Sequence, residues 1–193
     1  MRLPEVARGD SVGHRLMIGM ISRFAGYRLP DAARVAFYDR KFVGPVLGEW
    51  TQKVMRGPSS WSVSQRELMA AMVALWNSCP FCVGAHGAIA VRGMDDAIVS
   101  AVLADYTTAP IDEKYRATLV FLEKMTRNPS ALNVEDARAV LDAGVSQQEL
   151  SDAAAVCAIF NIITRYANAL GFEMPTPAEF AKAAGMLLRR GYG

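Results

Sequence analysis

Residues 67–86 read ELMAAMVALWNSCPFCVGAH, and this stretch decides the fold. Ala, Leu and Met favour helices, and β-branched residues are too few to suggest a strand. Asn77 and Ser78, followed by Pro80, interrupt the helical pattern, because a proline fits the first turn of a helix but not its interior. The stretch therefore predicts two helices joined by a tight turn, with the second helix beginning next to Cys79.

The same pattern extends over the rest of the chain and predicts an all-α, multihelical bundle. Apolar residues recur at spacings of three and four, and clusters of Pro, Gly, Asn and Ser separate the segments. No polar stretch is long enough to be a linker, so we expect residues 1–193 to form a single domain. The expected helices lie near residues 10–25, 31–55, 64–76, 79–92, 94–104, 111–126, 134–143, 147–170 and 177–189.

Composition and charge exclude several classes of protein. Hydrophobic residues make up 52% of the chain and charged residues 21%, as in globular proteins. A net charge of +2 is too balanced for a protein whose main partner is nucleic acid or an anionic membrane. No apolar run reaches the roughly 18 residues of a membrane span, and the first residues do not resemble a signal peptide. We therefore expect a cytoplasmic protein without a nucleic-acid or membrane partner.

A short motif occurs twice. SQREL at residues 64–68 returns 82 positions later as SQQEL at 146–150, and both precede an Ala-rich apolar segment. Each predicts a capping box, in which the Ser accepts a hydrogen bond from the amide three residues on and the Glu reaches back. The motif is either a common cap used twice or the trace of a duplicated helical unit, with a degenerate second copy at 146–172.

Cys79, Cys82 and His86 follow the spacing C-x2-C-x3-H, which places them on one face of a helix. The free amides and dipole at the start of that helix favour a thiolate, and two sulfurs at this spacing can form a disulfide. His86 can act as a base, and Glu67 from the preceding helix can orient the imidazole. Cys157 lies in an apolar run and is expected in the core.

The pattern E-x11-C-x2-C-x3-H, filled by Glu67, Cys79, Cys82 and His86, resembles the alkylhydroperoxidase D-like branch of the carboxymuconolactone decarboxylase family. The likeness is strongest over residues 60–105. It implies a helical homo-oligomer, a trimer or hexamer, that reduces peroxides with an external dithiol of the lipoyl type or similar. It also implies Cys82 as the peroxidatic sulfur, Cys79 as the resolving sulfur, His86 with Glu67 as a proton relay, and no bound cofactor or metal.

One position departs from this pattern. Characterised peroxidases of the family can carry a further His directly before the second Cys, where this chain has Phe81. The relay would then run on one imidazole. Decarboxylase members of the wider family lack the Cys pair, so the pair argues against lactone decarboxylation.

Three alternatives stay open at this point. The Cys pair could be a redox sensor in a helical oligomer that does not turn over. Cys79, Cys82 and His86 with one carboxylate could bind zinc, although structural zinc prefers two well-separated ligand pairs. Glu67 could serve only as a helix cap and His86 only as a core residue.

Overall fold

The computed structural model describes residues 1–39, 41 and 43–192. Within this part of the chain the fold is all-α and contains no strand, as the sequence predicts. The helices are α1 (Pro4–Arg8), α2 (Val12–Ala25), α3 (Asp31–Tyr38), α4 (Pro45–Arg56), α5 (Val63–Trp76), α6 (Pro80–Ala90), α7 (Asp96–Asp105), α8 (Glu113–Arg127), α9 (Val134–Asp142), α10 (Gln147–Leu170) and α11 (Pro177–Arg190), with a 3-10 turn at Pro129–Ala131.

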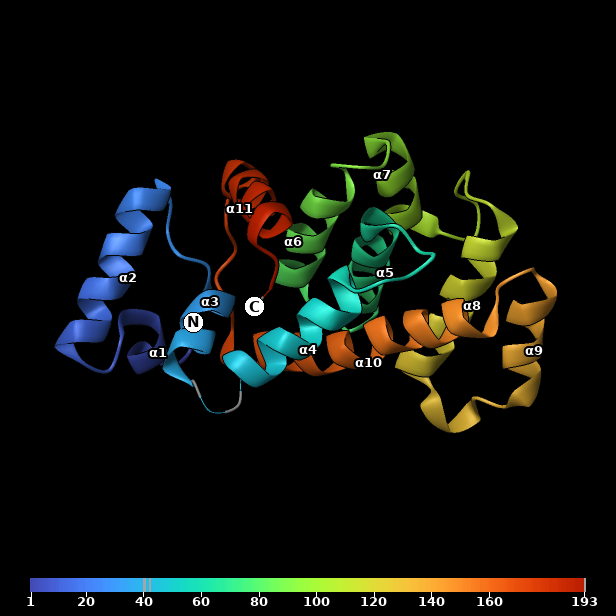
Figure 1. Ribbon diagram of the computed structural model, residues 1–193, viewed down its shortest axis with the longest axis horizontal. Helices are drawn as coiled ribbons and strands as arrows, with labels where there is room; N and C mark the ends of the chain where they lie inside the picture. The colour runs from blue at the N-terminus through green and yellow to red at the C-terminus, as the bar shows by residue number, and fades with distance from the viewer. Residues whose placement is uncertain (40, 42, 193) are drawn as a thin grey trace.

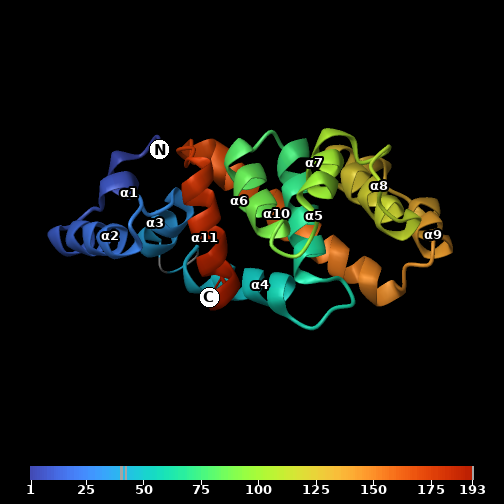
Figure 2. The same cartoon turned by 90° about the horizontal axis from the view of Figure 1, so that it is seen from above.

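The long helix α10 runs beneath the middle of the molecule to its far end (Figure 1) and contacts α4, α5, α6, α8 and α9. Helices α5 and α6 stand side by side in the middle, and α8 and α9 lie at the end away from the N-terminal helices. Seen from above, α11 lies between α6 and the N-terminal group of α1 to α3 (Figure 2). This arrangement places α6 between α5 and α11, against both of which it packs.

The core is built around α5 and α10. Every residue of α5 from Arg66 to Ala74 is buried, and α5 packs against α8 and α10. By length and composition α10 could cross a membrane, with a mean hydropathy of 1.3. Its buried residues, among them Ile159 and Phe160, belong instead to this hydrophobic core. Cys157 is fully buried there, as expected.

One predicted helix is wrong as a single element. The segment 31–55 consists of α3 and α4, and residues 40 and 42 of the predicted helix lie outside the described part of the chain. The reason is Pro45, which occupies the first turn of α4, because a proline cannot continue a helix from the residues before it. The short helix α1 was also not predicted.

The cap of α5 differs from the prediction. Ser62 is the N-cap: its hydroxyl accepts from the Gln65 amide, and the Gln65 side chain reaches back to the Ser62 amide. The capping box at Ser146 and Glu149 is confirmed. Ser62-x-x-Gln65 and Ser64-x-x-Glu67 both fit the capping-box pattern, so the sequence offers two overlapping caps, and the fold uses the earlier one. As a result Glu67 is not a cap.

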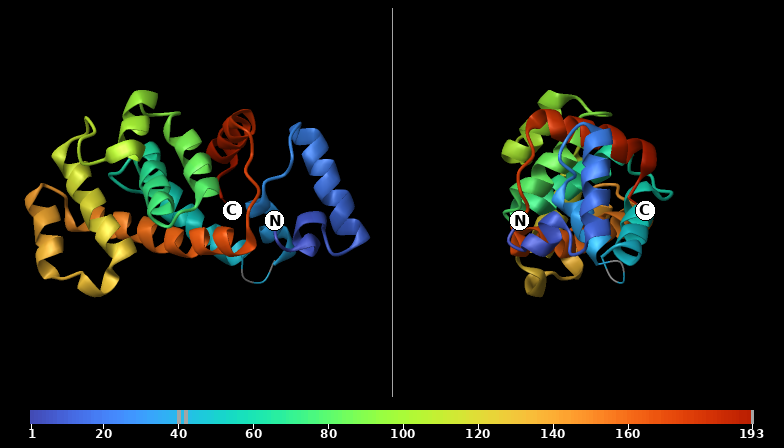
Figure 3. Two further views of the ribbon diagram at one scale, coloured as in Figure 1. Left: turned by 180° about the vertical axis from the view of Figure 1, so that it is seen from behind. Right: turned by 90° about the vertical axis from the view of Figure 1, so that its left-hand side faces the viewer.

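Helix α2 stands apart from the body of the molecule (Figure 3). One side of it exposes large apolar side chains at every fourth position: Val12, Leu16, Met20 and Phe24 are between 54% and 85% exposed. A helix of this length is barely stable in water unless an apolar face is covered. Among residues 1–39, 41 and 43–192, none covers the face of α2 formed by these four residues.

Candidate active site

The turn between α5 and α6 sets the position of the cysteine pair. Ser78 has a positive φ of 53°, which reverses the chain within two residues, and the Cys79 amide donates to the Ala74 carbonyl at 2.8 Å. Asn77 is fastened to α10 from both sides: its side chain donates to Asn161, and its carbonyl accepts from Asn168. The turn is therefore held in place by α10.

Cys79 is the N-cap of α6 and Pro80 is its first residue, so the pair lies at the start of the helix as predicted. Both cysteines are buried and reduced. The Cys82 thiol and the amides of Cys82 and Phe81 donate to the Cys79 sulfur and lower the pKa of Cys79 to about 7. The neighbouring Cys79 sulfur and burial raise the pKa of Cys82. Near neutral pH Cys79 is therefore partly ionised, and the negative charge that forms rests on its sulfur and is shared with the Cys82 thiol through their hydrogen bond.

The sulfurs lie in a small apolar cluster of their own. The Phe81 ring packs edge-on against the Phe172 ring, with 5.1 Å between the ring centroids. The centroid of the Phe180 ring of α11 lies 6.0 Å from that of Phe81. Gly84 of α6 lets the Phe180 ring come this close to α6, because a Cβ at position 84 would lie 2.6 Å from that ring. The surroundings of the pair are thus dry and aromatic, which suits an apolar substrate better than a charged one.

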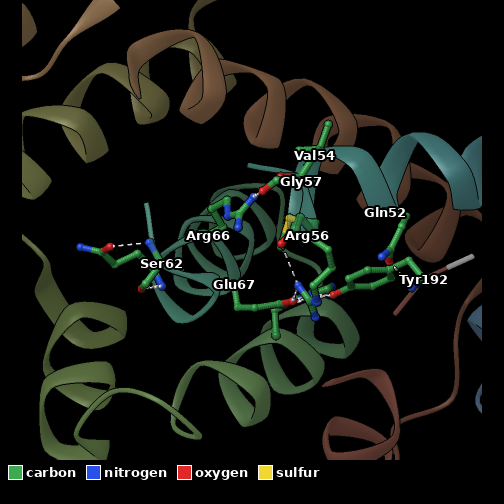
Figure 4. A network of polar contacts seen from close by, with 11 residues as sticks. Gln52, Val54, Arg56, Gly57, Ser62, Arg66, Glu67 and Tyr192 are labelled. Atoms are coloured by element: carbon green, nitrogen blue, oxygen red, sulfur yellow. Dashed lines mark hydrogen bonds and ion pairs between the residues drawn. The ribbon is translucent and has the colours of Figure 1, made fainter. Parts of the chain in front are cut away.

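Glu67 and His86 meet beside α4. Packing of α5 on α6 brings Glu67 Oε2 to 2.6 Å from His86 Nδ1, 19 positions further along the chain. Arg56 of α4 donates to Glu67 Oε1 at 2.7 Å, and the Tyr192 hydroxyl donates to the same oxygen at 2.8 Å. Figure 4 shows Arg56 and Tyr192 converging on the Glu67 carboxylate. Glu67 is fully buried, so these donors replace the water it has lost.

Burial raises the pKa of Glu67, but the hydrogen bond and charge of His86 and the guanidinium of Arg56 outweigh it and hold the pKa below its usual value. Glu67 is therefore a carboxylate and can only accept hydrogen bonds. Its partner nitrogen, Nδ1 of His86, must carry the proton. In the neutral ring Nε2 is then the basic nitrogen.

The four predicted site residues form two neighbouring groups. Cys82 and His86 lie one turn apart on α6, but no hydrogen bond joins the imidazole to either sulfur among the described residues. Proton transfer between them needs a bridging water or substrate. In the part of the chain that the structure describes, no group of three or more His, Cys, Asp or Glu side chains is arranged to hold a metal.

Sequence reasoning missed Arg56 and Tyr192. Both touch Glu67, but Tyr192 is 125 positions away from it in the sequence. Neither lies in a motif, and an Arg in the last turn of a helix is ordinarily a surface residue. Only the packing of α4 beside α5 and the path of the chain after α11 bring them to the carboxylate.

No model of a protein family matches the sequence, and no curated protein matches it either. Solved structures do. A peroxidase-related protein from Silicibacter sp. TM1040 is 25% identical, with a TM-score of 0.75 and coverage of 93% of both chains. A second peroxidase-related protein, from Ralstonia eutropha JMP134 and described as an alkylhydroperoxidase AhpD core, is 24% identical, with a TM-score of 0.73 over 94% of this chain and 93% of that one. These likenesses show that the chain has the fold of the alkylhydroperoxidase D-like proteins.

The AhpD-like fold also occurs in an enzyme with another named activity. The debrominase Bmp8, solved alone and as a variant in complex with 2,3,4-tribromopyrrole, has a TM-score of 0.70 over 92% of this chain and 94% of its own. It is 17% to 18% identical to this AhpD-like chain, so the likeness concerns the fold. Neighbours on this fold thus include proteins named as peroxidase-related and as a debrominase.

Proposed function

We propose that the protein is a thiol-dependent peroxidase that reduces small, apolar hydroperoxides through Cys79 and Cys82, with Glu67 and His86 as the proton relay. The observation that carries the proposal is the buried thiol pair, with its shared negative charge, one helical turn from an imidazole that a carboxylate orients. The peroxidase-related proteins of the same fold support it.

The proposed cycle balances without a metal or bound cofactor. One cysteine sulfur attacks the peroxide O–O bond, which yields a sulfenic acid and releases an alcohol. The second sulfur displaces water from the sulfenic acid and forms the Cys79–Cys82 disulfide. An external dithiol, of the lipoyl type or similar, reduces this disulfide by thiol exchange and leaves as its own disulfide. His86 accepts and returns the protons, and Glu67 stabilises its charged form.

Which sulfur attacks the peroxide first is a separate prediction. The negative charge of the resting pair lies on Cys79, whereas the base, His86, lies one helical turn after Cys82. The amides that stabilise the Cys79 thiolate also make it a weaker nucleophile. General-base help contributes about a hundredfold or more, and a helix dipole much less. We therefore expect Cys79→Ser, given one equivalent of peroxide, to form a trappable sulfenic acid at Cys82. The matched Cys82→Ser variant should form little at Cys79, and preferential labelling of Cys79 would reverse the order.

Steady-state turnover tests the proposal against its alternatives. The reduced protein should consume many equivalents of cumene hydroperoxide when a dithiol such as dihydrolipoamide is supplied. A redox sensor would stop after one equivalent. A thiol pair could equally supply the two electrons that replace a carbon–bromine bond by carbon–hydrogen, so 2,3,4-tribromopyrrole serves as a comparison substrate. Turnover of the bromopyrrole without turnover of the hydroperoxide would contradict the proposal.

We also expect the protein to be a homo-oligomer, because the apolar face of α2 needs a cover. Light scattering at micromolar concentration should give a multiple of 21.0 kDa. Leu16→Glu, which places a charge in the middle of this face, should lower the measured mass. A monomeric mass for the unaltered protein would contradict this expectation.

A further inference from the structure

The segment that follows α11 returns to the relay and adds a side chain to it. The Tyr192 amide donates to Gln52 Oε1 at 2.8 Å, which ties the segment to α4. The Tyr192 hydroxyl then reaches both oxygens of Glu67, at 2.8 and 3.1 Å (Figure 4). It also lies 3.4 Å from His86 Nδ1. Among the described residues, Tyr192 is thus a neutral side chain that touches both members of the carboxylate–imidazole pair.

The ring of Tyr192 has a role distinct from its hydroxyl. The guanidinium carbon of Arg56 lies 4.9 Å from the ring centroid, within the range of a cation–π contact. Two nitrogens of Arg56, Nε and Nη2, are buried without a hydrogen-bond partner in the described part of the chain. The ring face of Tyr192 therefore gives the Arg56 guanidinium a favourable contact in addition to its ion pair with Glu67.

The hydroxyl of Tyr192 can only act as a donor toward Glu67. Burial and the Glu67 carboxylate raise the pKa of Tyr192 well above its usual value, so the phenol stays protonated. The charged and titratable groups that face Glu67 come from α4 (Arg56), α6 (His86) and the segment after α11 (Tyr192), with Arg66 on its own helix. Three donors therefore share the two oxygens of one buried carboxylate.

We propose that Tyr192 is a positioning residue of the relay: its hydroxyl fixes the Glu67 carboxylate and takes up part of its hydrogen-bonding capacity, so that Glu67 orients the His86 ring without over-stabilising its protonated form and Nε2 stays available as the base. The proposal rests on the function proposed above for the Glu67–His86 pair. Without the hydroxyl, Glu67 has one donor fewer and holds the imidazole proton more strongly. The imidazole then stays protonated to higher pH, so a smaller fraction of it is free to accept a proton near neutral pH.

Imidazole ¹⁵N spectra test this directly, because the chain contains only two histidines. The reduced, ¹⁵N-histidine-labelled protein is titrated without peroxide, and a His14→Gln variant assigns the signals. In the unaltered protein we expect the Nδ1-protonated tautomer of His86. In Tyr192→Phe the midpoint of the His86 signal should move to higher pH by about half a unit to one unit. The acid limb of the peroxidase pH profile should move with it.

Two further variants separate the hydroxyl from the ring. Tyr106→Phe is the matched control, because it removes another Tyr–Glu hydrogen bond, to Glu123, and should leave the His86 titration unchanged. Tyr192→Ala also removes the ring from Arg56. If Tyr192→Phe titrates like the unaltered protein and only Tyr192→Ala differs, Tyr192 acts by packing and the proposal is overturned. The spectra need no turnover, so a protein that fails to reduce peroxides contradicts the proposed function but leaves this test intact.

Discussion

Cys79→Ser and Cys82→Ser are each expected to lower the multiple-turnover reduction of cumene hydroperoxide by about a thousandfold or more. Without Cys79 the Cys82 sulfenic acid has no neighbouring thiol with which to form the disulfide, and without Cys82 little sulfenic acid forms at all. The assay follows oxidation of the dithiol together with release of cumyl alcohol. Both variants should fold, since serine is close to cysteine in size and the turn before Cys79 is held by backbone and Asn contacts.

Cys157→Ala is the matched control for these two variants. Cys157 is fully buried in α10 and contacts Thr126 rather than the thiol pair. Burial raises its pKa, so it is a poor nucleophile at neutral pH. Full turnover in Cys79→Ser, or loss of turnover in Cys157→Ala with an intact fold, would contradict the proposed pair.

Glu67→Gln should lower turnover by about a hundredfold, because the neutral amide cannot stabilise a protonated His86. It should also destabilise the fold, since it leaves the Arg56 guanidinium buried without its counter-ion. Breaking a buried ion pair in this way costs about 3 to 5 kcal/mol. Urea unfolding and turnover, measured at a temperature at which the variant is folded, separate the two effects.

Glu149→Gln is the control for Glu67→Gln. Glu149 pairs with Lys114 at 2.6 Å and caps α10, far from the thiol pair in the fold. Its loss should cost about 1 kcal/mol of stability and leave turnover unchanged. If Glu67→Gln keeps full turnover, Glu67 is structural and the relay is not as proposed.

The sequence predicted the helices well where local chemistry decides them. Pro80 and Pro177 begin helices, and the Ser146 cap is where the motif places it. It failed where two local signals compete, as in the overlapping caps at Ser62 and Ser64, or where one proline had to outweigh a long apolar pattern, as at Pro45. In both cases the pattern alone does not say which signal the folded chain will use.

The sequence likewise predicts only some of the residues of the candidate site. Glu67 and His86 lie on consecutive helices joined by a short turn, so their meeting could be expected from spacing. Arg56 and Tyr192 reach the same carboxylate through tertiary packing, and no sequence motif predicts either of them. The position of the resting charge on Cys79 also depends on geometry, because it requires the Cys82 thiol and two amides to point at one sulfur.

The most direct test of the account is a single oxidation of the unaltered protein. The reduced protein is mixed with one equivalent of cumene hydroperoxide, and its peptides are mapped by mass spectrometry with free thiols blocked. We expect one equivalent of cumyl alcohol and a Cys79–Cys82 disulfide, with Cys157 still reduced. Unconsumed peroxide with all three cysteines reduced, or oxidation confined to Cys157, would contradict it.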